Sequence, residues 1–245
     1  MQDVERRFTE EVSVLKARIK FRKYGVMKFI GHLDIMRYFQ KAMRRAEIPI
    51  AFTGGYSPHM VMSFANPLGV GLTSDGEYFD IELSESVDFA QAVRRLNEAM
   101  VEGMEIVNMI EISDDKKKTG MAIVAAADYL SEFVMEHPVE NLADKIDAFR
   151  SQPEIIVWKK TKKSEKDVNI KPMIYDMREQ DGKVYMLVAT GSVENLKPEL
   201  VMQAFGKFLG IDLEETAMRH HRLEVYADVG SEGQRHLVPL DQLGI

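Results

Sequence analysis

The chain has 245 residues, an ordinary globular composition and a formal net charge of −7 at pH 7, so it is long enough for one or two domains with a hydrophobic core. The absence of cysteine excludes disulfides, thiolate catalysis and cysteine-ligated zinc or iron–sulfur clusters. No apolar run reaches the roughly 18 residues of a membrane span, and the charged N-terminal sequence lacks the apolar core of a signal peptide. We therefore expect a cytoplasmic protein without membrane contact.

Positive charge is concentrated near the N-terminus. Between Lys16 and Arg45 the sequence has ten Lys or Arg residues and a single acid, Asp34. Since the whole chain is acidic, this asymmetry indicates a basic patch for an anionic partner.

The first predicted elements carry this charge. Residues 1–15 form a charged leader to which we assign no function. Polar and apolar residues then alternate over Lys16–Tyr24, which predicts a strand with a basic outer face. A helix follows over His32–Glu47, because its apolar residues recur at helical spacing. Its exposed face is predicted to carry a separate basic row, namely Arg37, Lys41, Arg44 and Arg45.

A long glycine-rich connection, Gly54–Tyr78, comes next. Connections of this length are usually functional or disordered, and this one is too apolar for a solvated coil. We predict an ordered loop, with Ile48–Phe52 before it as an edge strand because a sheet edge tolerates Pro49. The alternative places the strand at Met60–Phe64. The following segments are predicted to be a strand at Tyr78–Leu83, a helix at Asp88–Val101 and a strand at Met104–Ile112.

The same order of elements restarts after Asp114–Gly120, which has the composition of a linker. The predicted elements of the second half are Ala125–Met135 (strand), Val139–Arg150 (helix), Glu154–Lys159 (strand), Val184–Thr190 (strand), Pro198–Leu209 (helix) and Arg222–Ala227 (strand). Each half thus has the β-α-β-β-α-β order of a ferredoxin-like unit. We predict an α+β protein with two tandem units and antiparallel sheets, at residues 16–113 and 121–228, followed by a tail at 229–245.

Two surfaces of the first unit are candidates for anion binding. The helices of such a unit cover one sheet face, so the basic outer face of the first strand could meet RNA phosphates. However, the first strand pairs with the third in this topology, and cross-strand ion pairs to Asp80 and Glu82 would neutralise Arg18 and Lys20. We favour this second interpretation, which leaves the basic row of the helix as the better anion site.

Two histidines suggest an alternative, catalytic function. If Ile48–Phe52 is the second strand, the loop returns to the start of the first helix and brings His59 beside His32 and Asp34. Such a group can perform acid–base chemistry or bind a metal, with an anion held at the helix start among Gly54, Gly55, Tyr56 and Ser57. If Met60–Phe64 is the strand, the group does not form. The sequence contains no HxH, HExxH or nucleotide-binding loop pattern, so we assign no metal site and no cofactor.

Three sequence blocks carry a resemblance to a known family. They are KARIKFRKYGVMKFIGHLD, GGYSPHMVMSFANPLGVG and SDGEYFDIEL, and the chain resembles the radical-SAM-linked proteins of unknown function. These proteins occur alone or as a C-terminal extension of cobalamin-binding radical SAM proteins. Two further similar blocks, Asn195–Val201 and Arg219–Tyr226, add Lys197 and Arg222 to the expected binding residues.

The resemblance implies a radical SAM protein as partner and, from the gene neighbourhoods of such families, a role with RNA or a ribosomal component. Without cysteine, this chain is not itself a radical SAM enzyme. We expect an accessory protein that binds RNA or a ribonucleoprotein substrate for that partner. The alternatives are an RNA-processing enzyme that uses His32 and His59, or a pure protein–protein adaptor.

Overall fold

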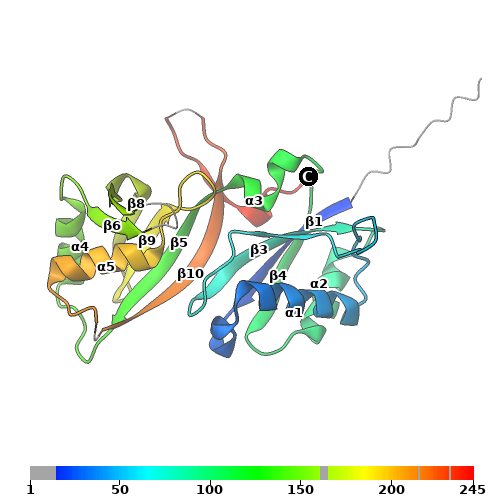
Figure 1. Cartoon of the computed structure of the whole chain (residues 1–245), viewed down its shortest axis with the longest axis horizontal. Coiled ribbons are helices and arrows are strands. Elements are labelled where there is room, and N and C mark those ends of the chain that lie inside the picture. Colours follow the sequence, from blue (N-terminus) through cyan, green and yellow to red (C-terminus); the bar gives the residue numbers. More distant parts are fainter. Residues whose placement is uncertain (1–14, 161–164, 215, 232) are drawn as a thin grey trace, which may run out of the picture.

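A computed structural model describes residues 15–160, 165–214, 216–231 and 233–245, so the expected leader lies outside the described residues except for Leu15. The fold is mixed α+β (Figure 1). It has one nine-stranded, mostly antiparallel sheet, a separate two-stranded sheet and, among the described residues, five α-helices. None of the helices in the described part of the chain is long and apolar enough to cross a membrane.

Both halves contribute to the large sheet, whose strand order is β4-β1-β3-β10-β5-β9-β8, with β2 paired to β3 and β11 paired to β10. The first half comprises β1 (Leu15–Lys23), α1 (His32–Arg45), β2 (Met62–Ala65), β3 (Thr73–Leu83), α2 (Phe89–Ala99) and β4 (Met104–Ile112). The second half comprises α3 (Gly120–Ile123), β5 (Val124–Val134), α4 (Leu142–Arg150), β8 (Ile174–Gln180), β9 (Lys183–Ala189), α5 (Pro198–Leu209), β10 (Ala217–Asp228) and β11 (Leu237–Pro239). Between α4 and β8, the strands β6 (Ile156–Lys160) and β7 (Glu165–Asn169) form the small sheet.

The two halves do not have separate sheets, contrary to the sequence-based prediction. β3 begins at Thr73, well before the predicted Tyr78, and this added part pairs in parallel with His221 and Arg222 of β10. Gly76 permits the close approach, because a Cβ at this position would lie 2.9 Å from both Glu224 Cα and the Leu223 carbonyl oxygen. The long reach of β3 therefore joins the halves.

The predicted edge strand Ile48–Phe52 is also wrong. Ile50 and Phe52 form only isolated bridges, to Leu83 and Met60. The edge of β3 over Tyr78–Ile81 is instead occupied by β2, close to the alternative prediction at Met60–Phe64. The connection Gly54–Tyr78 is therefore not one loop, since it contains β2 and the first residues of β3.

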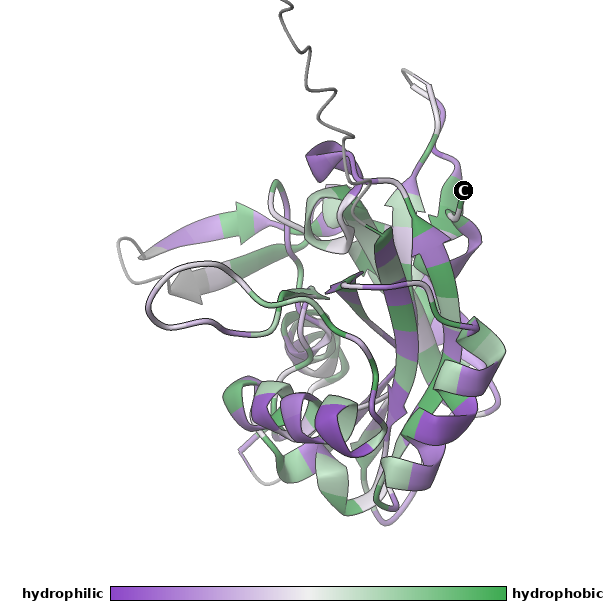
Figure 2. Cartoon of the chain, turned by 90° about the vertical axis from the view of Figure 1, so that its right-hand side faces the viewer, coloured by the Kyte–Doolittle hydropathy of each residue, from purple (hydrophilic) through white to green (hydrophobic). Residues whose placement is uncertain are grey.

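The structure has two hydrophobic cores, one within the first half and one in the second half that also takes in Ala65, Leu68, Leu72 and Tyr78. Strands and helices alternate between hydrophilic and hydrophobic residues (Figure 2), as expected for elements with one buried face. Phe21, Phe39 and Phe79 lie at the centre of the first core, and Phe149 and Phe205 contact each other in the second. These cores fix α1 on the first half and α5 on the second.

Candidate functional site

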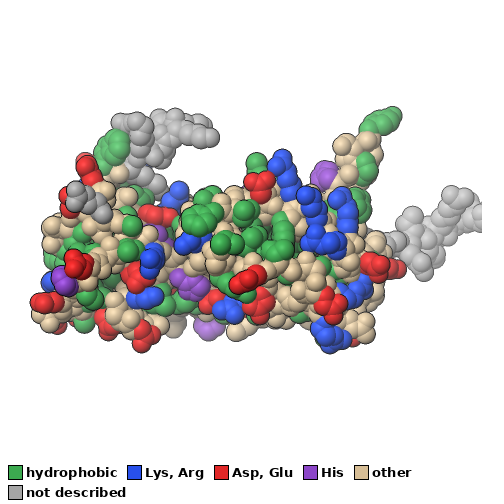
Figure 3. Space-filling model, turned by 90° about the horizontal axis from the view of Figure 1, so that it is seen from below, with side chains coloured by type: hydrophobic (Ala, Val, Ile, Leu, Met, Phe, Trp, Pro, Cys, Tyr) green, Lys and Arg blue, Asp and Glu red, His purple; other side chains and the backbone are tan. Residues whose placement is uncertain are grey.

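The basic row of α1 is exposed, as the sequence predicts. Its four members, Arg37, Lys41, Arg44 and Arg45, all lie on the solvent side of the helix. The opposite side buries Phe39 and Met43, among others, which fixes the orientation of the helix. In the space-filling view, Lys and Arg side chains gather beside a group of hydrophobic ones (Figure 3).

Two members of the row are already engaged. Arg37 Nη1 lies 3.1 Å from Asp34 Oδ1, and Arg45 Nη2 donates to the Ala99 carbonyl oxygen at 2.9 Å. Among the described residues, Lys41 and Arg44 have no acidic partner. Their charges are therefore compensated only by solvent, which makes them available to a bound anion.

The basic face of β1 is neutralised inside the molecule, as we favoured. Arg18, directly opposite Asp80 in the β1–β3 register, donates to its two carboxylate oxygens at 2.8 and 3.0 Å. Lys16 lies 3.1 Å from Glu82 and 2.7 Å from Asp114. The predicted cross-strand pair is thus confirmed for Arg18 with Asp80, whereas Glu82 pairs with Lys16 rather than with Lys20.

The expectation of an open sheet face is wrong at β1. Arg18 is only 1 % exposed, because it also donates to the carbonyl oxygens of Leu240 and Lys118. Leu240 belongs to a short 3-10 helix near the C-terminus (Leu240–Gln242), and Lys118 to another just before α3 (Lys116–Lys118). These segments cover the strand, so RNA phosphates cannot reach it there.

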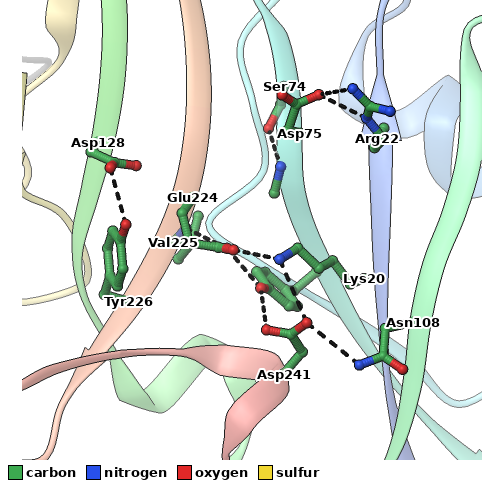
Figure 4. Close-up of polar contacts among 12 residues, drawn as sticks. Lys20, Arg22, Ser74, Asp75, Asn108, Asp128, Glu224, Val225, Tyr226 and Asp241 are labelled. Atoms are coloured by element: carbon green, nitrogen blue, oxygen red, sulfur yellow. Dashed lines mark hydrogen bonds and ion pairs between the residues drawn. The ribbon is translucent and has the colours of Figure 1, made fainter. Parts of the chain in front are cut away.

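Lys20 finds its partners in the second half rather than on β3. Its ammonium pairs with Glu224 and lies 3.5 Å from Asp241 Oδ2 (Figure 4). The Tyr78 hydroxyl donates to Glu224 Oε1 at 2.7 Å. Burial raises the pKa of Glu224, although the hydrogen bonds from Lys20 and Tyr78 oppose this shift. The group is a closed polar network that ties the halves together.

Arg222, expected to bind a ligand, is a structural residue. Its guanidinium is 1 % exposed, pairs with Glu77 and donates to the Asn66 carbonyl oxygen at 3.1 Å. Lys23 lies near the same carboxylate, and burial lowers the pKa of its ammonium. The sequence block that suggested Arg222 thus marks the junction of the halves.

The expected group of His32, Asp34 and His59 does not form. His32 packs edge-on against Phe64, with ring centroids 5.1 Å apart. His59 precedes Phe64 by five residues of extended chain. At about 3.3 Å per residue, the backbone positions of His59 and Phe64 are roughly 16 Å apart, and His32 lies at the Phe64 end. His59 is instead held by Thr53, whose Oγ1 lies 3.0 Å from its Nδ1. This geometry excludes shared acid–base chemistry at the two imidazoles.

The other predicted binding residues are exposed. Gly54, Gly55, Tyr56 and Ser57 lie at the tip of the connection, and Tyr56 is fully exposed. Lys197 is an exposed residue at the start of α5. Among the described residues, no group of three or more His, Asp or Glu side chains is placed to hold a metal ion.

A groove of about 430 Å³, which the sequence analysis missed, lies at the junction beside α1. One wall is formed by His32, Met36 and Phe64 of the first half, and the other by residues such as Met121 and Gly191. The residues that line this groove come from separate segments of the chain, so no local sequence pattern predicts the groove. The groove places an apolar surface beside the start of the basic row.

The sequence matches the model of a known protein family. A family model described as "Uncharacterized protein conserved in bacteria (DUF2344)" matches residues 16–198. The matched region contains β1, α1 and the whole of the basic row. No curated protein matches the chain.

Proposed function

The chain belongs to this family of uncharacterized bacterial proteins, and we propose that it is a non-catalytic cytoplasmic accessory protein that binds RNA or a ribonucleoprotein substrate for a radical SAM partner. The observation that carries the proposal is the contrast between two basic elements. The cations of β1 are paired internally, whereas Lys41 and Arg44 of α1 project into solvent without acidic partners among the described residues.

An unpaired basic row on a helix suits phosphate contacts. Lys and Arg side chains that neutralise phosphates supply most of the sequence-independent affinity for nucleic acids. The chain is acidic overall, so a nucleic acid would be steered to this row and repelled elsewhere. A single row of this kind predicts a modest affinity that depends strongly on salt.

The strand order supports a ferredoxin-like interpretation of each half. The first half has strands in the order β4-β1-β3-β2 and the second in the order β10-β5-β9-β8, each with the β-α-β-β-α-β succession of such units. We propose two ferredoxin-like units fused edge to edge, with the β6–β7 hairpin as an insertion in the second. This fold is compatible with RNA binding but does not by itself imply it.

The radical SAM partner is proposed from the sequence resemblance. A chain without cysteine has no thiolate to hold an iron–sulfur cluster, so the chemistry would belong to the partner. The expected result is anaerobic co-purification with a cluster-binding radical SAM protein that survives nuclease treatment. If the chain retains no such protein under these conditions, this part of the proposal is wrong.

RNA binding is tested by fluorescence anisotropy with a labelled single-stranded RNA. The variant Lys41→Glu/Arg44→Glu reverses the two unpaired cations and should weaken binding at least tenfold. The control Lys183→Glu/Arg219→Glu makes the same change in net charge at the half-exposed Lys183 of β9 and the exposed Arg219 of β10, which both lie 3.8 Å from Glu132, and should bind nearly as well as the wild type. Equal losses in both variants, or no RNA binding at all, would refute the proposal.

A further inference from the structure

A second groove lies on the other half, between the β6–β7 hairpin and α5. Its volume is about 460 Å³, within the range of small-molecule sites. The lining is mostly apolar and aromatic, and its members include Ile156, Trp158, Phe208, Gln152, Gln203 and Lys207. The hairpin forms one wall and α5 the other, so two elements that each pack on the second half leave a cleft between them.

Large apolar side chains are exposed at the mouth of this groove. Trp158 is 57 % exposed, Ile156 51 % and Phe208 42 %. Trp158 is also the only tryptophan in the chain. Exposed aromatic side chains grouped around a cleft are typical of binding surfaces rather than of surfaces that face only water.

The polar members of the lining restrict the chemistry of a ligand. Among the described residues that line the groove, Lys207 is the only charged one, and it is exposed on α5. Gln203 is exposed as well, whereas the Gln152 amide nitrogen already donates to the Phe149 carbonyl oxygen at 3.0 Å. The aromatic ring of Trp158, the exposed amide of Gln203 and the cation of Lys207 together suit a ligand that is aromatic, carries hydrogen-bonding edges and is anionic.

We propose that this groove binds a base of single-stranded RNA, stacked on Trp158, with Gln203 at the base edge and Lys207 at the adjoining phosphate. The inference rests on the proposed function and specifies single-stranded RNA as the substrate class. Unpaired bases expose the faces that stack on aromatic side chains, whereas bases inside a duplex do not. An acidic or purely apolar peptide is less suited, since it would leave either the exposed ring face or the lysine without a matching group.

The single tryptophan makes the site directly observable. Titration of the full chain with a ten-nucleotide oligoadenylate should quench the fluorescence of Trp158, and a duplex RNA of the same length should not. By anisotropy with the labelled oligonucleotide, Trp158→Ala should weaken binding about tenfold, and Trp158→Phe should retain most of the affinity. Val107→Ala, which truncates an exposed apolar side chain on β4, serves as the control.

The outcomes separate this inference from the proposed function. Because Trp158 carries no charge, Trp158→Ala should leave the salt dependence of binding intact, whereas Lys41→Glu/Arg44→Glu reduces it. Salt-dependent RNA binding without quenching, and without an effect of Trp158→Ala, would overturn the inference and leave the proposed function standing. Absence of RNA binding would overturn both. Tight binding of an apolar dye that Trp158→Ala abolishes, with RNA affinity unchanged, would also overturn the inference, because the groove would then bind apolar molecules without contributing to RNA affinity.

Discussion

The buried ion pair between Arg18 of β1 and Asp80 of β3 makes a strong prediction for Asp80→Asn. Asp80 accepts two hydrogen bonds from the 1 % exposed Arg18 and a third, at 2.6 Å, from the Gly120 N–H. The substitution leaves the buried guanidinium without a countercharge and turns an amide donor toward groups that are themselves donors. Removing one partner of a buried ion pair typically lowers the free energy of unfolding by about 3–5 kcal/mol. We expect a loss of about 3 kcal/mol here, at the lower end of this range, because an amide oxygen in the place of Oδ2 can still accept two of the three bonds.

The assay is urea denaturation followed by far-UV circular dichroism, from which the free energy of unfolding is obtained by linear extrapolation. Asp34→Asn is the matched control, because it removes the same charge from the exposed Asp34–Arg37 pair. Exposed pairs contribute about 0–1 kcal/mol, so the control should be nearly neutral. If Asp80→Asn lowers the free energy of unfolding by less than about 1 kcal/mol, or by no more than the control does, the Arg18–Asp80 pair does not behave as a buried ion pair and the reasoning fails.

Three further outcomes follow from the junction of the halves and from the loop. Gly76→Ala should destabilise the fold by at least about 1 kcal/mol, because its methyl group would meet the backbone at Leu223 and Glu224. Thermal unfolding measures this loss. The control Gly69→Ala, whose nearest neighbouring atom would be 3.9 Å from the added Cβ, should change the stability little. Burial tends to raise the pKa of Asp75, but hydrogen bonds from His221 and Arg22 outweigh it and hold this pKa below its usual value. The resulting stabilisation is complete above about pH 4 and is lost as the pH falls through the lower folded-state pKa. Asp75→Asn should therefore lower the free energy of unfolding at pH 7 by up to about 1 kcal/mol, and this difference from the wild type should vanish near about pH 2. A constant difference at all pH values would contradict this origin. His59→Ala should leave RNA affinity and thermal stability nearly unchanged, since an exposed hydrogen bond to Thr53 is its main contact; a large loss of RNA affinity at unchanged thermal stability would restore a functional role to the loop histidine.

Local pattern predicted the elements whose neighbours lie in the same half. Periodicity located β4 and α5 at the observed bounds, Met104–Ile112 and Pro198–Leu209. The pairing of Arg18 with Asp80 followed from the strand order of a single unit. These predictions succeeded because the hydrophobic periodicity and the pairing of the first and third strands are set within about a hundred residues.

The features that failed depend on contacts between distant segments. The partners of Lys20, Glu224 and Asp241, lie more than two hundred residues away along the chain, and nothing local to β1 indicates them. The edge position of Pro49 was a sound reason to expect a strand, but β2 competes for the same edge of β3 and occupies it. Both grooves likewise combine segments that only the tertiary fold brings together.

The measurement that tests the central claim most directly is the salt dependence of RNA binding. The observed association constant is measured by anisotropy over a range of salt concentrations, for the wild type and for Lys41→Glu/Arg44→Glu. For single strands, each phosphate contact contributes about 0.7 to the slope of log K against log salt concentration. Loss of two contacts should therefore flatten the slope by about 1.4, and the control Lys183→Glu/Arg219→Glu should keep the wild-type slope. An unchanged slope in Lys41→Glu/Arg44→Glu would contradict the assignment of the α1 row as the RNA-binding surface.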